Sequence, residues 1–135
     1  MMDAALRAFV RERAGRRCEY CRLHEDDDDF LAVHVEHVIA KQHGGLDDPD
    51  LLRWAGAEGN WAKGPNLAGL LGGKLYPLFN PRKQKWHRHF RWEHTILFGK
   101  TKTGIVTVQV LNMNDPARVM LRENLLFEGR FPPEE

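Results

Sequence analysis

Three polar residues in the first half of the chain have side chains suited to phosphodiester hydrolysis. Glu36 and His37 are adjacent, and Asn60 follows after a glycine-containing turn. A carboxylate and an amide oxygen can hold a hard divalent cation, and an imidazole with a pKa of about 6.5 can take a proton from water at neutral pH. A cation held there would stabilise charge on the phosphate and on the leaving oxygen. These residue types therefore predict a metal-assisted hydrolytic site.

The stretch that carries Glu36 and His37 is expected to be a strand. Residues 30–40 read FLAVHVEHVIA, which is rich in β-branched side chains, and a histidine–glycine turn follows at residues 43–45. Successive side chains of a regular strand point to opposite faces, so Glu36 and His37 can serve one site only if the strand twists, bulges or ends there. His34 and His43 are expected to be hydrogen-bonded strand and turn residues, and a supporting contact to the metal or a phosphate is the alternative.

A cysteine pair with the spacing of half a zinc knuckle precedes this strand. Cys18 and Cys21 are the only cysteines of the chain, whereas a structural zinc needs four protein ligands. His24 or an acid among residues 25–29 could add a ligand, but two thiolates without a second pair should bind zinc weakly. We therefore expect no structural zinc. The plainer interpretations are a pair of small buried residues or a redox pair.

The formal net charge of +1 conceals a strong asymmetry along the chain. Residues 25–50 hold nine acids against one base, and residues 80–102 hold seven bases against one acid. The acidic run at residues 25–29 is expected to be a solvated loop. Trp86, Phe90 and Trp92 are expected to anchor the core, while basic side chains on the opposite helix face are candidates for phosphate contact. These candidates are Arg82, Lys83, Lys85, Arg88 and Arg91.

The sequence predicts a single α+β domain over residues 1–135, with a core at about residues 16–68 and a C-terminal extension at about residues 74–131. A first helix is expected over residues 3–14, and a second begins after Asp50. A basic helix over residues 80–90 begins with Asn80 as its cap and Pro81 as its first residue. A β-hairpin then joins residues 91–98 to residues 105–111, and a last amphipathic helix covers residues 114–128 before Gly129.

Composition limits the class of protein. The chain is 42% hydrophobic, and it has no apolar run near the roughly 20 residues that a membrane span requires. It does not open with a basic segment followed by an apolar one, as a secretory signal would. Two closely spaced cysteines do not make a secreted disulfide framework. We therefore expect a cytoplasmic protein with no membrane partner.

Taken together, several motifs resemble the HNH endonuclease family. The likeness is carried by CEYC, VEHVIAKQHGG, DDPD and NWAKGPNLAG in that order, and it continues through PLFNPRKQKW, HFRWE, TGIVTVQVLNMNDP and EGRFPP. It covers most of the chain after about Arg13. The resemblance implies a ββα-metal core, in which Glu36 and Asn60 bind a divalent cation such as Mg²⁺ or Mn²⁺ and His37 is the general base. Lys63 matches the basic tail of that motif, and the implied partner is nucleic acid.

The chain departs from the family pattern at supporting positions. The family reads approximately DNLxxxCxxCNxxKG where this chain reads DLLRWAGAEGNWAKG. Leu51 takes the place of the middle Asn, and Gly56 and Gly59 take the places of the second cysteine pair. If both glycines lay inside a helix, each would cost about 1 kcal/mol relative to alanine.

Three functions from different classes are compatible with these residues. The favoured one is a metal-dependent HNH-type endonuclease that hydrolyses phosphodiester bonds, with DNA as the expected substrate. The second is a catalytically impaired module that keeps the fold and binds nucleic acid or regulates, an interpretation favoured by Leu51, Gly56 and Gly59. The third is a non-catalytic protein-interaction domain, which no residue supports directly.

Overall fold

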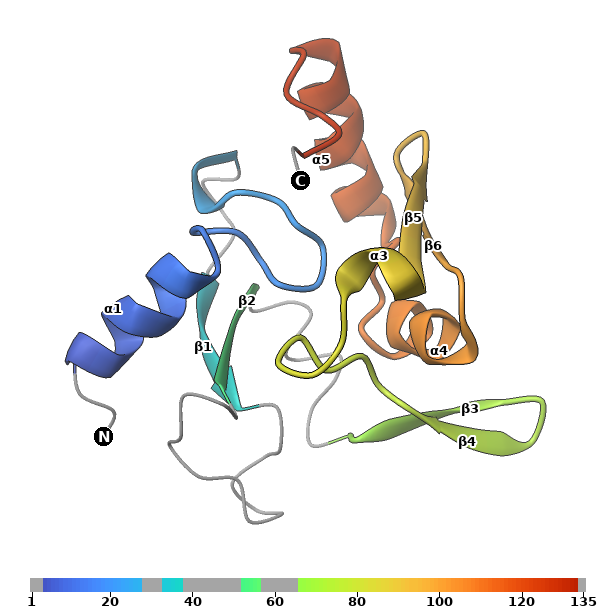
Figure 1. Ribbon diagram of the computed structural model, residues 1–135. Helices are drawn as coiled ribbons and strands as arrows, with labels where there is room; N and C mark the ends of the chain where they lie inside the picture. Colours follow the sequence, from blue (N-terminus) through green and yellow to red (C-terminus); the bar gives the residue numbers. More distant parts are fainter. Residues whose placement is uncertain (1–3, 28–32, 38–51, 57–65, 134–135) are drawn as a thin grey trace.

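The computed structural model describes residues 4–27, 33–37, 52–56 and 66–133 as a mixed α+β fold (Figure 1). The sheet structure in these residues consists of three two-stranded antiparallel hairpins. They are β1 (Val33–His37) with β2 (Leu52–Gly56), β3 (Ala68–Leu71) with β4 (Lys74–Pro77), and β5 (Phe90–Glu93) with β6 (Ile96–Gly99). The helices are α1 (Ala4–Arg13), α3 (Trp86–His89), α4 (Lys102–Val110) and α5 (Pro116–Phe127), with a 3₁₀ turn η1 (Glu25–Asp27). Within these four ranges, none of the helices has the length and apolar character needed to cross a bilayer.

Helix α1 and strand β1 form where the sequence predicts a helix and a strand. The prediction of a helix after Asp50 is wrong. Residues 52–56 instead form the strand β2, which pairs with β1 in the register His37↔Leu52 and Glu36↔Arg53. Residues 52–55 are all buried, so packing on both faces fixes the extended conformation over any helical preference. Gly56 is the last residue of β2, and the helical penalty expected for it does not apply. Leu51 and Gly59 lie outside the described residues.

The β3–β4 hairpin was not predicted, although its turn has a recognisable signal. Gly72 and Gly73 separate two short apolar runs, and both have positive φ angles, of 59° and 81°. Only glycine and a few polar residues adopt two successive positive φ values at low cost, which is why a Gly-Gly pair favours a tight hairpin. The register Leu71↔Lys74 confirms a two-residue connection.

The basic helix predicted over residues 80–90 is much shorter than expected. Asn80 caps no helix and Pro81 begins none: residues 81–84 form a turn, in which Asn80 Oδ1 accepts the Arg82 backbone N–H at 2.9 Å. The helix α3 covers only Trp86–His89, and Phe90 then enters β5 in an extended conformation. Burial of Trp86 and Phe90 in the core confirms that the aromatic residues of this segment are anchors.

The hairpin predicted between residues 91–98 and 105–111 is also wrong. The strand β5 turns back at His94 and Thr95 to pair with β6, and residues 102–110 form the helix α4. Thr101 caps this helix by accepting a hydrogen bond from the Gly104 N–H at 3.0 Å. An added Cβ on Gly104 would collide with the carbonyl oxygen of His89, so glycine permits α4 to pack closely against the end of α3. The alternating β-branched residues of this segment thus serve a helix.

The helix α5 confirms its prediction closely. Asp115 is the N-cap and accepts a hydrogen bond from the Ala117 N–H at 3.0 Å, and Pro116 is the first helical residue. Gly129 has a φ of 75°, which suits the left-handed residue that ends many helices. Helices α4 and α5 pack with β5, β6 and the loop of residues 16–24, here called the cysteine loop, around one main apolar core.

Candidate functional site

Glu36 and His37 are adjacent on β1, which pairs with β2 in a two-stranded antiparallel sheet. His37 is the last residue of β1 and pairs with Leu52, the first residue of β2. The chain beyond His37 lies outside the described residues, so the condition under which adjacent strand positions can serve a single site stays a prediction. His34 lies farther along β1, opposite Ala55. His43, Asn60 and Lys63, which complete the predicted set, fall outside the described residues.

Helix α1 and the cysteine loop hold β2 in place by direct contacts. Val10 packs with Leu52 and Trp54 in a second, smaller apolar cluster, and Arg13 Nη2 donates to the Leu52 carbonyl oxygen at 2.8 Å. Glu19 makes two hydrogen bonds with Trp54: its N–H donates to the Trp54 carbonyl oxygen at 2.9 Å, and its Oε2 accepts from the Trp54 N–H at 2.8 Å. The strand that pairs with Glu36 and His37 is thus fixed along its backbone.

Glu19 also links β2 to the segment before α3 through an ion pair with Arg82. The Arg82 side chain is only 12% exposed, and burial, with repulsion from Arg13, lowers its pKa to about 10. The guanidinium remains charged at neutral pH and holds the turn of residues 81–84 against the cysteine loop. Arg82 was predicted as a phosphate contact, and the structure gives it this structural role.

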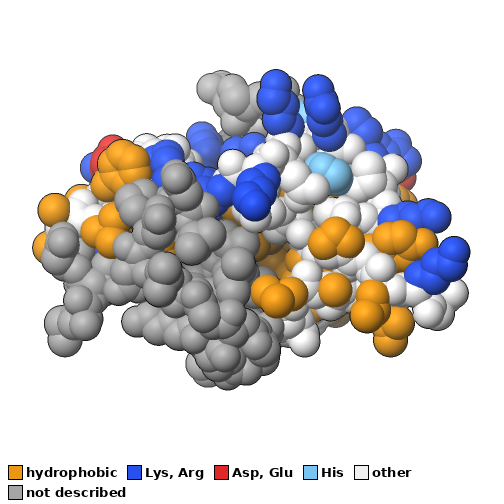
Figure 2. Space-filling view, turned by 60° about the horizontal axis from the view of Figure 1, so that its bottom comes forward, with side chains coloured by type: hydrophobic (Ala, Val, Ile, Leu, Met, Phe, Trp, Pro, Cys, Tyr) orange, Lys and Arg blue, Asp and Glu red, His pale blue; other side chains and the backbone are white. Residues whose placement is uncertain are grey.

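The other four basic candidates differ from Arg82 in exposure. Lys83, Lys85, Arg88 and Arg91 are all exposed on the segment that leads through α3 into β5. Arg91 pairs with Glu93 at 2.6 Å and lies over the Phe98 ring. Figure 2 shows Lys and Arg side chains gathered along one edge of the molecule, beside a group of exposed hydrophobic side chains. Phosphate contact by these four residues stays a prediction.

The cysteine pair forms a tight buried loop. Cys18 and Cys21 are each 3% exposed, and the Cys21 N–H donates to Cys18 Sγ at 3.5 Å. The Cys18 carbonyl oxygen accepts a hydrogen bond from the Arg22 N–H, and the Cys18 N–H donates to the Leu23 carbonyl oxygen. The hydrogen bond with Cys18 and burial raise the pKa of the Cys21 thiol well above its usual range. Both side chains belong to the main apolar core, as the plainer interpretation expects.

His24 is engaged with its own loop. Its Nδ1 accepts the Asp26 backbone N–H at 3.0 Å, and the ring lies beside the Asp26 carboxylate. Across the described ranges of the chain, no three His, Cys, Asp or Glu side chains gather into a group that could hold a metal ion.

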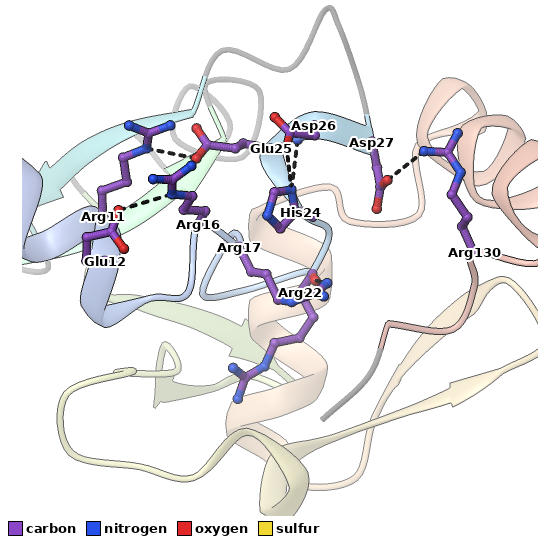
Figure 3. Close-up of polar contacts among 10 residues, drawn as sticks. All are labelled: Arg11, Glu12, Arg16, Arg17, Arg22, His24, Glu25, Asp26, Asp27 and Arg130. Carbon is purple, nitrogen blue, oxygen red and sulfur yellow. Dashed lines mark hydrogen bonds and ion pairs between the residues drawn. The ribbon is translucent and has the colours of Figure 1, made fainter.

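The acidic run is more ordered than a solvated loop. Glu25 pairs with Arg11 of α1, and Asp27 pairs with Arg130 near the C-terminus, each at 2.8 Å (Figure 3). Asp26 is exposed. Two of the acids therefore bond the η1 turn to α1 and to the segment after α5. Residues 28 and 29 lie outside the described residues.

A chelator should not unfold this protein. If packing of the buried thiols supports the cysteine loop, incubation with excess EDTA will leave the melting temperature nearly unchanged. The measurement is a thermal unfolding curve followed by circular dichroism, with metal analysis of the same sample. A large fall in melting temperature, together with one tightly held zinc per chain, would contradict the packing account, because zinc bound only to the folded state contributes directly to its stability.

Comparison of the chain with protein-family models, curated proteins and solved structures found no match.

Proposed function

We propose that this chain is a divalent-metal-dependent nuclease of the HNH type, which hydrolyses phosphodiester bonds of nucleic acid, with DNA as the expected substrate. The observation that carries the proposal is the place of Glu36 and His37 side by side on β1, which pairs antiparallel with β2. Two antiparallel strands are the first two elements of the ββα-metal motif that the sequence resembles. The exposed bases of residues 83–91 supply a surface of the sign that a polyanion requires.

The donor set of the proposed site suits a hard cation. Glu36 offers a carboxylate and Asn60 an amide oxygen, and Mg²⁺ and Mn²⁺ favour oxygen ligands. A bound cation would supply electrophilic stabilisation of the phosphate. His37, as a neutral imidazole, would accept the proton of the attacking water. This division needs His37 unprotonated, so activity should fall as the pH drops below the imidazole pKa.

The contacts of β2 support catalysis through positional rigidity. A base and a metal ligand on adjacent residues must keep one relative geometry, and small displacements in an active site are costly. β1 itself has β2 as its antiparallel partner, and β2 is bonded to α1 by Arg13 and to the cysteine loop by Glu19. This bracing uses packing and hydrogen bonds at a place where the family uses a full zinc knuckle.

The test is a plasmid-nicking assay with Mg²⁺, with Mn²⁺ and with excess EDTA. We expect nicking with either metal and none with EDTA. Glu36→Gln should raise the metal concentration needed for half-maximal nicking, because it removes the charged ligand. Glu123→Gln, which removes one exposed carboxylate from α5, is the matched control and should behave as the natural chain. Metal-independent DNA binding with no cutting by any of the proteins would favour the catalytically impaired binding module.

A further inference from the structure

A pocket of about 640 Å³ opens between three segments that are distant in the sequence. The cysteine loop contributes Arg17 and Arg22, α3 contributes Trp86 and His87, and β5 contributes Trp92, while two prolines near the C-terminus close the remaining side. Figure 1 shows the cysteine loop, α3 and the C-terminal end of the chain approaching one another in this region. Ligand pockets in proteins are commonly about 300–1,000 Å³, so this one has room for a small molecule or one residue of a polymer.

The positive charge of the pocket favours an anionic ligand. Two guanidinium groups line it, and none of its described lining residues is acidic. Arg17 Nη1 donates to the Arg22 carbonyl oxygen at 3.3 Å, which holds the Arg17 guanidinium at the backbone of the cysteine loop. Figure 3 shows the Arg22 side chain extending away from Glu25 and Asp26, whose carboxylates face other partners. Guanidinium groups present paired N–H donors that match the oxygens of a phosphate.

The floor of the pocket is aromatic and fixed. Trp86 Nε1 donates to the Tyr20 carbonyl oxygen at 2.6 Å, and the Arg22 guanidinium lies 5.5 Å from the centre of the Trp86 ring. The ring centres of Trp92 and Trp86 are 5.9 Å apart. The His87 ring meets the Trp86 ring edge-on, with the two ring centres 5.5 Å apart. Trp86 is only 4% exposed and supports the floor from beneath, so a planar ligand would meet the exposed His87 ring and the half-buried Trp92 ring. Aromatic and guanidinium planes together are the usual partners of unstacked nucleobases.

We propose that this pocket binds an unpaired nucleotide, with its phosphate on Arg17 and Arg22 and its base against the aromatic floor. The choice of nucleic acid rests on the proposed function, which it deepens by naming an unpaired nucleotide as a part of the substrate that the protein holds. His87 lines the pocket and is exposed, and Arg88, the next residue of α3, is also exposed; these two would continue the phosphate path beyond the pocket. The same base-plus-phosphate chemistry could come from a strand or from a free mononucleotide.

Binding is measured in EDTA, so that no cutting occurs, by tryptophan emission and by the anisotropy of a labelled short oligothymidylate. The natural chain should bind the oligothymidylate and should bind a duplex of equal length more weakly. The pair Arg17→Gln and Arg22→Gln should weaken oligothymidylate binding about tenfold or more, because both charged phosphate contacts of the pocket are lost. The matched control is Arg7→Gln with Lys74→Gln, which removes the same charge from exposed positions on α1 and β4 and should change the affinity much less.

His87→Glu is the second variant, since His87 is exposed and the new carboxylate can repel a phosphate; circular dichroism checks that loss of the ring contact with Trp86 leaves the protein folded. It should weaken binding as the arginine pair does. Tighter binding of oligothymidylate than of thymidine monophosphate identifies a strand as the source, and equal binding identifies a free nucleotide. Affinity for single strands that neither His87→Glu nor the arginine pair reduces overturns the pocket, whatever the nicking assay shows. Loss of binding in these variants together with metal-independent or absent nicking upholds the pocket and removes only the nuclease.

Discussion

His37→Asn is expected to lower the rate of metal-dependent plasmid nicking by about 10²–10⁴-fold, the range in which a positioned general base contributes to catalysis. Asparagine keeps a polar side chain of moderate size but cannot take a proton from water at neutral pH. The pairing of His37 with Leu52 is made by the backbone of β1 and β2, so the exchange of the side chain leaves it in place. The measurement is the initial rate of conversion of supercoiled to nicked plasmid under saturating Mg²⁺.

His94→Asn is the matched control for this substitution. His94 is exposed in the turn between β5 and β6 and has a φ of 56°, a conformation that asparagine adopts readily. It should cut plasmid at the rate of the natural chain. Equal rates in His37→Asn and His94→Asn, with both proteins folded by circular dichroism, would remove His37 as the base. A pH–rate profile adds a second readout, because the acid limb that a histidine base produces should be absent in any residual activity of His37→Asn.

The elements that the sequence predicts well are those whose local signals and tertiary packing agree. Helix α5 has an aspartate cap, a proline at its first position and a glycine after its end, and all three perform those roles. Helix α4 is the opposite case. Its β-branched alternation favours a strand, but the cap at Thr101 and the burial of Val106 and Thr107 against neighbouring elements favour a helix. Tertiary contacts of this kind cannot be predicted from a local sequence pattern.

The candidate site divides in the same way. A strand that carries Glu36 and His37 is predictable from residue types, and the structure agrees with it over residues 33–37. Arg82 shows what composition cannot reveal. It lies in the most basic stretch of the chain, yet its partner Glu19 is more than sixty positions away along the chain and is brought to it by the fold. Arg17 and Arg22 join Trp86 and Trp92 for the same reason, so only the structure reveals their shared pocket.

Arg122→Met is expected to lower the free energy of unfolding by about 3–4 kcal/mol, because it removes a buried charged donor and leaves its acceptors without one. Arg122 is 1% exposed. It donates to the Thr95 carbonyl oxygen at 2.9 Å and to Asn114 Oδ1 at 3.0 Å, and it also bonds the Met113 carbonyl oxygen. Its guanidinium lies 5.1 Å from the centre of the Trp92 ring. One side chain thus joins α5 to the β5–β6 turn and to the segment after α4.

Methionine replaces the aliphatic stem of Arg122 but not its guanidinium, so the substitution removes the hydrogen bonds together with the volume of that group. Burial lowers the Arg122 pKa to about 10, and three polar acceptors compensate for that desolvation. Loss of the Arg122 contact also affects β6, because Asn114 is bonded to Leu97. Asn114 Oδ1 accepts the Leu97 N–H, and Asn114 Nδ2 donates to the Leu97 carbonyl oxygen at 2.9 Å. Urea unfolding followed by tryptophan emission measures the change. Arg130→Met, which removes an exposed arginine with surface ion pairs, should have a much smaller effect. Similar midpoints for the two variants would show that the buried cluster around Arg122 contributes no more than a surface pair, and that apolar contacts alone hold α5 to the β5–β6 hairpin.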